Sequence, residues 1–103
     1  MNQVSEALSA LAGYQNEHAA YGFVVRGPYI LSEEQRAARE AEVRAVVAEI
    51  EALAVAAETR PIAHAEIDPL LARFREVGKH PPGELVSDVA RAIVAVEAER
   101  VRD

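Results

Sequence analysis

The longest uninterrupted helical pattern in the chain runs from Ser32 to Thr59. It opens with Ser-Glu-Glu-Gln, in which Ser32 and Gln35 can form a capping box and the two glutamates suit the positive end of a helix. Alanine, glutamate, arginine and valine dominate the rest of the segment, without a glycine or a proline, until Pro61 ends the pattern. The pattern predicts one long helix at about 33–58.

Apolar residues on this helix recur at heptad spacing, which is typical of a face that packs against another helix. The chain is rich in alanine and therefore offers little apolar bulk for a monomeric core. We expect this seam to pack across the interface of a homo-oligomer, most simply a dimer, although the helices of one chain could also bury it. The seam consists of Val43, Val46, Ile50, Leu53 and Ala57.

The segment before the long helix admits two interpretations. A helix can start near residue 3, with Asn2 or Ser5 as its cap, and Gly13 could end it. A spacing of 4-3-4-3-4 favours instead one helix to about residue 24, followed by an extended linker. This spacing joins Ala7, Leu11, Tyr14, His18, Tyr21 and Val25. The alternative is a hairpin that pairs Tyr21–Val25 with Tyr29–Leu31.

The pattern of residues 62–103 predicts two more helices. We expect 62–67 to form a short turn or helix, and Asp68 with Pro69 to begin a helix that ends at Gly78. The final helix is expected at about 84–100, with Val86, Val89, Ile93 and Val96 on its buried face. The fold class is therefore all-α: one domain over 1–103, a small bundle of three to four helices with a long central helix.

Composition narrows the possible functions. The formal net charge is −6 over 103 residues, and no segment is basic, which disfavours a nucleic-acid-binding protein. Cysteine is absent. The N-terminus does not resemble a signal peptide, and no apolar run approaches about 20 residues, so we expect a cytoplasmic protein. Arginine far outnumbers the single lysine, which is typical of the GC-rich genome of a bacterium or its phage.

The sequence offers little catalytic chemistry. His64-Ala65-Glu66 matches half of a zinc deaminase motif, but the half that holds the metal requires cysteines. A metal site could use His18, His64 or His80 with carboxylates. The close pairs, Glu17 beside His18 and His64 two positions before Glu66, do not have the i,i+3 or i,i+4 spacing that turns two ligands to one helical face. No nucleophile elbow or phosphate-binding glycine motif occurs. We therefore predict no catalytic residue, no metal and no cofactor.

Aromatic residues gather before the long helix and suggest a binding surface. They are Tyr14, Tyr21, Phe23 and Tyr29, which could contact a protein partner or cover the ends of the core. The favoured interpretation is a non-enzymatic protein-binding or assembly protein, whose protein partner is unknown. One alternative is a small helical enzyme or ligand-binding protein that uses His18, His64, Glu66 and tyrosines. A DNA-binding regulator is a third, disfavoured by the net charge.

Overall fold

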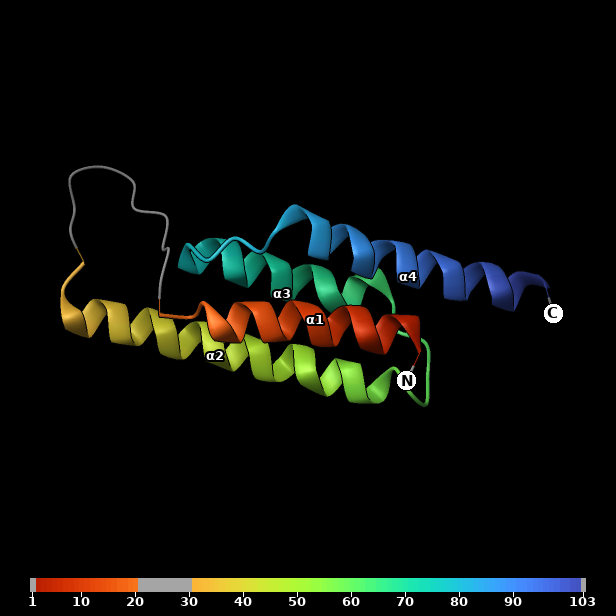
Figure 1. Cartoon of the computed structure of the whole chain (residues 1–103), viewed down its shortest axis with the longest axis horizontal. Helices are drawn as coiled ribbons and strands as arrows, with labels where there is room; N and C mark the ends of the chain where they lie inside the picture. The colour runs from red at the N-terminus through yellow and green to blue at the C-terminus, as the bar shows by residue number, and fades with distance from the viewer. Residues whose placement is uncertain (1, 21–30, 103) are drawn as a thin grey trace.

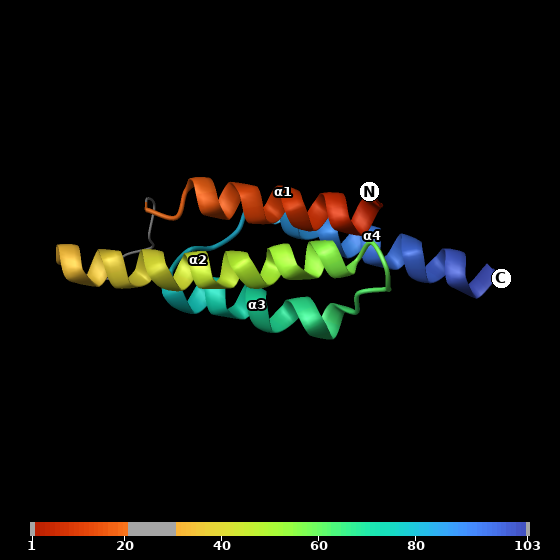
Figure 2. The same ribbon diagram turned by 90° about the horizontal axis from the view of Figure 1, so that it is seen from below.

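The computed structural model describes residues 2–20 and 31–102 of the chain (Figure 1). These residues form four helices and no strand: α1 (Gln3–Glu17), α2 (Glu33–Ala56), α3 (His64–Val77) and α4 (Gly83–Arg102). Successive helices run in opposite directions along one long axis (Figures 1 and 2). The expected all-α bundle with a long central helix is confirmed.

The pair α1 and α2 forms the centre of the bundle. The helix α3 packs on α2, and α4 packs on α1 (Figure 2). Apolar side chains from all four helices meet between them, and the largest that are fully buried are Phe74, Leu8, Leu11, Ile50, Ile93, Val43 and Val46. Two polar contacts also join α3 to α2: Arg73 pairs with Glu49, and Arg39 Nη1 donates to the Val77 carbonyl at 3.0 Å.

The start of α2 agrees with the capping box that the sequence predicts. The Gln35 N–H donates to Ser32 Oγ at 3.1 Å, and the Ser32 N–H donates to Gln35 Oε1 at 2.9 Å. The predicted capping box is therefore present in both directions. The helix ends at Ala56, two residues before the expected end, and the chain turns before Pro61.

The seam of α2 lies inside this chain's own core. Val43 and Ile50 are 0% exposed, Val46 and Ala57 are also buried, and Leu53 is half-buried. Large residues of the neighbouring helices, such as Leu8 of α1 and Phe74 of α3, are buried in the same apolar cluster. A face that was expected to pack between copies is thus covered within one copy, because four helices supply enough apolar side chains to enclose it.

The helix α1 differs from its prediction in length. It passes through Gly13 but ends at Glu17, so the expected continuation to about residue 24 is wrong. The His18 N–H closes the last turn by donating to the Tyr14 carbonyl at 3.1 Å. The buried face is Val4, Leu8, Leu11 and Gln15, whereas Tyr14 is exposed. Residues 21–30 of the alternative hairpin lie outside the described residues.

The helix α3 begins at His64, before the predicted cap at Asp68, and contains Pro69. The prediction failed because the cap is made by a residue inside the helix: the Ala63 N–H donates to Glu66 Oε2 at 2.9 Å. The other end is as predicted. Gly78 has φ 91°, in the left-handed region that favours glycine after a helix.

The helix α4 extends beyond the rest of the bundle at its C-terminal end (Figures 1 and 2). It is longer than expected at both ends, and its buried residues Val89 and Ile93 belong to the predicted face, on which Val86 and Val96 are half-buried. The radius of gyration is 15.0 Å, against about 13 Å for a compact domain of this length. The molecule is therefore elongated, and Glu97, Ala98 and Glu99 near the end of α4 are exposed.

Candidate functional site

The structure does not bring the candidate catalytic residues together. His18 follows the last turn of α1, at one end of the bundle. His64 and Glu66 open α3 at the opposite end, where the N-terminus of α1 also lies (Figure 1). His80 follows the C-terminus of α3 and is exposed. A single site built from His18, His64, tyrosine and Glu66 is not formed by this arrangement.

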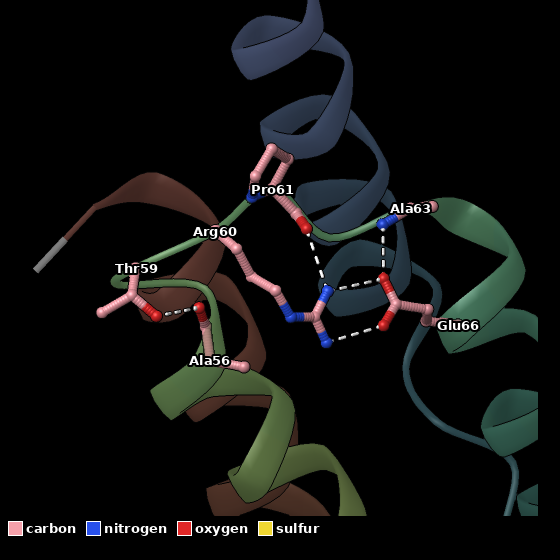
Figure 3. A network of polar contacts seen from close by, with 6 residues as sticks. All are labelled: Ala56, Thr59, Arg60, Pro61, Ala63 and Glu66. Atoms are coloured by element: carbon pink, nitrogen blue, oxygen red, sulfur yellow. Dashed lines mark hydrogen bonds and ion pairs between the residues drawn. The ribbon is translucent and has the colours of Figure 1, made fainter.

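Glu66 instead holds the turn between α2 and α3, as Figure 3 shows. The Arg60 guanidinium donates to both of its carboxylate oxygens, at 2.8 and 3.1 Å, and also to the Pro61 carbonyl at 3.0 Å. The hydrogen bonds from Arg60 and then from the Ala63 N–H lower the pKa of Glu66, because both stabilise its charged form. This network fixes the first turn of α3 and leaves Glu66 engaged in structure.

Of the four aromatic residues proposed for partner binding, the described part of the chain contains one. Tyr14 is 39% exposed, and its ring stacks on that of His18 with centroids 4.1 Å apart. His18 Nδ1 also lies 2.9 Å from the Tyr14 carbonyl oxygen. Tyr21, Phe23 and Tyr29 lie outside the described residues. The stacked pair is a small exposed aromatic surface at the C-terminal end of α1.

A buried polar contact joins α1 to the loop after α3, and sequence reasoning missed it. Gln15 is 0% exposed, and its Nε2 donates to the Lys79 carbonyl at 2.9 Å. Lys79 is the only lysine of the chain and is 6% exposed, so its burial lowers its pKa. No local signal points to this contact, because its two residues are 64 positions apart in the sequence.

The outer face of α2 carries small apolar side chains at heptad spacing. It lies opposite the buried seam and is exposed to solvent, and Val55 on it is 69% exposed. We call this surface the outer face of α2; its members are Ala38, Ala41, Ala45, Ala48, Ala52 and Val55. The 3-4 alternation of these positions was visible in the sequence, but the valines and isoleucine of the seam gave the stronger signal.

A second open surface is a groove of about 480 Å³ between α1 and α4. Four alanines, two from each helix, form its apolar part, and Gln3, Glu6, Asp88 and Arg91 form its polar part. The alanines are Ala7, Ala10, Ala92 and Ala95. Its position could not be predicted from sequence, because it depends on which face of α4 packs on α1.

Comparisons with protein-family models, with curated proteins and with solved structures find no match to this chain. Within residues 2–20 and 31–102, no three histidine or acidic residues are grouped so that they could hold a metal ion. In the same part of the chain, no helix combines the length and the apolar character that a membrane span requires. The outer face of α2 and the groove are the candidate binding surfaces described above.

Proposed function

We propose that this chain is a non-enzymatic assembly protein that binds a second copy of itself through the outer face of α2. The observation that supports this proposal is that α2 is apolar on two opposite sides. One side is the seam that builds the core, and the other is the outer face, open over 18 residues from Ala38 to Val55. A helix of a monomeric bundle needs only one apolar side.

Self-association suits the chemistry of the outer face. Alanine side chains let two helix axes approach closely, and the heptad spacing keeps the same face toward a neighbouring helix over several turns. The stretch is about 26 Å long, at 1.5 Å per residue. Identical faces can pair about a two-fold axis, which is the commonest symmetry of soluble oligomers.

One pair of charged residues beside the outer face is complementary in an antiparallel arrangement. When Ala45 faces Ala48 of the second copy, Arg44 lies near Glu51 of that copy, and the symmetry repeats this pair. Arg44 is 49% exposed and already bonds Glu40 and Asn16. Its contact with Glu51 would therefore add a modest, salt-sensitive term that sets the register.

The test is the mass of an Ala45→Glu variant, measured by size-exclusion chromatography with light scattering. Ala45 is exposed, so the change leaves the core intact, whereas in the pair it would place carboxylates in a closely packed interface. We expect a lower mass than that of the unaltered protein at equal concentration. The matched control is Ala72→Glu, at an exposed alanine of α3, which should leave the mass unchanged.

The proposal is overturned if Ala45→Glu and Ala72→Glu give the same mass as the unaltered protein. Circular dichroism of both variants should show unchanged helix content, which separates a lost contact from a lost fold. A small molecule that stays bound through purification would instead support the alternative of a ligand-binding protein.

A further inference from the structure

We infer that a second, independent self-association site exists: the projecting end of α4 occupies the groove between α1 and α4 of another copy. This inference rests on the proposed function in one respect, namely that the chain assembles with itself. The surface is different, because the groove lies on α1 and α4 and the outer face lies on α2.

The first observation is that the groove and the projecting end share one face of α4. Asp88, Arg91, Ala92 and Ala95 line the groove. Ala98 and Glu99 come three and four residues after Ala95, which puts them on the same helical face. Both are exposed. Ala95 lines the groove together with Gln3, the first residue of α1, and α4 continues beyond the rest of the bundle (Figure 2).

The second observation is that this face is complementary to itself in antiparallel orientation. Consider a two-fold axis that crosses α4 at Ala95. A residue a given number of positions before Ala95 in one copy then lies opposite the residue the same number of positions after Ala95 in the second copy. Ala98 of the second copy then lies over Ala92, which lines the floor of the groove and is itself 7% exposed, three residues either side of the axis. Arg91 faces Glu99 of the second copy, four residues either side, and symmetry supplies this pair twice.

The existing contacts leave these charges available. Arg91 is 80% exposed, and its contact with Asp88 at 3.6 Å is long and on the surface. In this register residues 96–99 of one copy run along the alanines of the other copy's groove. The paired stretch 91–99 would be about 12 Å long, at 1.5 Å per residue.

The two surfaces together determine the form of the assembly. One two-fold surface alone closes a dimer, whereas two different two-fold surfaces on one chain join copies beyond the dimer, into a closed tetramer or an open series. The unaltered protein should therefore exceed the mass of a dimer as concentration rises. The Ala45→Glu variant, which lacks only the α2 contact, should stop at a dimer.

The test is a charge reversal in the Ala45→Glu background, followed by sedimentation equilibrium. Arg91→Glu should weaken the remaining dimer roughly tenfold or more, since two pairs turn repulsive. Combining Arg91→Glu with Glu99→Arg should restore the dimer, because the pairs re-form with opposite polarity. Glu97→Arg, an exposed position outside this face of α4, is the control and should not weaken it.

The inference is overturned if the Ala45→Glu protein is a monomer throughout, or if the double reversal does not restore the dimer lost in Arg91→Glu. A different result would contradict the proposed function. In that case Ala45→Glu would have the same mass as the unaltered protein, while the Arg91 variants would still have a lower mass. All four substituted positions are on the surface, so circular dichroism should show an intact fold in each variant.

Discussion

The substitution Ile50→Ala tests whether the seam of α2 is the core of a single chain. Ile50 is 0% exposed and belongs to the apolar cluster built from all four helices. The change removes three carbon groups, each worth about 0.8 kcal/mol on burial, and leaves a cavity that adds a further cost. We expect the free energy of unfolding to fall by about 3–4 kcal/mol, from a total of about 5–15 kcal/mol for a domain of this size.

Urea unfolding followed by circular dichroism measures this loss, with the midpoint shifted and the slope unchanged. Val94→Ala is the control, because Val94 is 55% exposed and its truncation should cost less than about 0.5 kcal/mol. A loss below about 1 kcal/mol for Ile50→Ala, or equal losses for the two variants, would refute the assigned register. A loss that depends on protein concentration would show that the seam is buried between copies.

Three further predictions concern polar groups. Ser32→Ala should lower the free energy of unfolding by about 1 kcal/mol in urea titrations, because it removes the acceptor of the Gln35 N–H. The pKa of Glu66 is lowered in the folded state, so its stabilising contribution is present above the unfolded pKa of about 4.5. That contribution is lost as pH falls through the folded pKa. The substitution Glu66→Gln should therefore reduce the fall in melting temperature at acid pH. The pKa of Lys79 is also lowered in the folded state, so the unfolded state holds the lysine proton more tightly. The free energy of unfolding should therefore rise with pH between the folded pKa and the unfolded pKa of about 10.5. This rise should be smaller in Lys79→Met. An unchanged profile in either variant would contradict the corresponding assignment.

The elements whose signals are local in sequence were predicted well. The start of α2 depends on Ser32 and Gln35, three residues apart, and the end of α3 depends on Gly78 alone. The length of α1 was misassigned because the heptad-like series through Ala7, Leu11 and Tyr14 continues in the sequence beyond Glu17, where the helix ends.

Contacts between distant parts of the chain explain what could not be predicted at the candidate site. Burial of Gln15 depends on a carbonyl in the loop after α3, and the α3 start depends on the Arg60–Glu66 pair. The groove exists only because α4 packs on α1 with Ala92 and Ala95 toward it. The heptad spacing of the alanines on the outer face of α2 is present in the sequence. That these alanines are exposed to solvent follows only once the structure shows which face of α2 is buried in the core.

The most direct test of the central claim is the mass of the unaltered protein in solution. One chain has a mass of 11.2 kDa. Light scattering across the micromolar range should give a mass that rises with concentration above that of one chain, because both proposed surfaces, the outer face of α2 and the groove, would bind further copies. A mass of one chain at every concentration would contradict self-assembly, and with it both proposed surfaces.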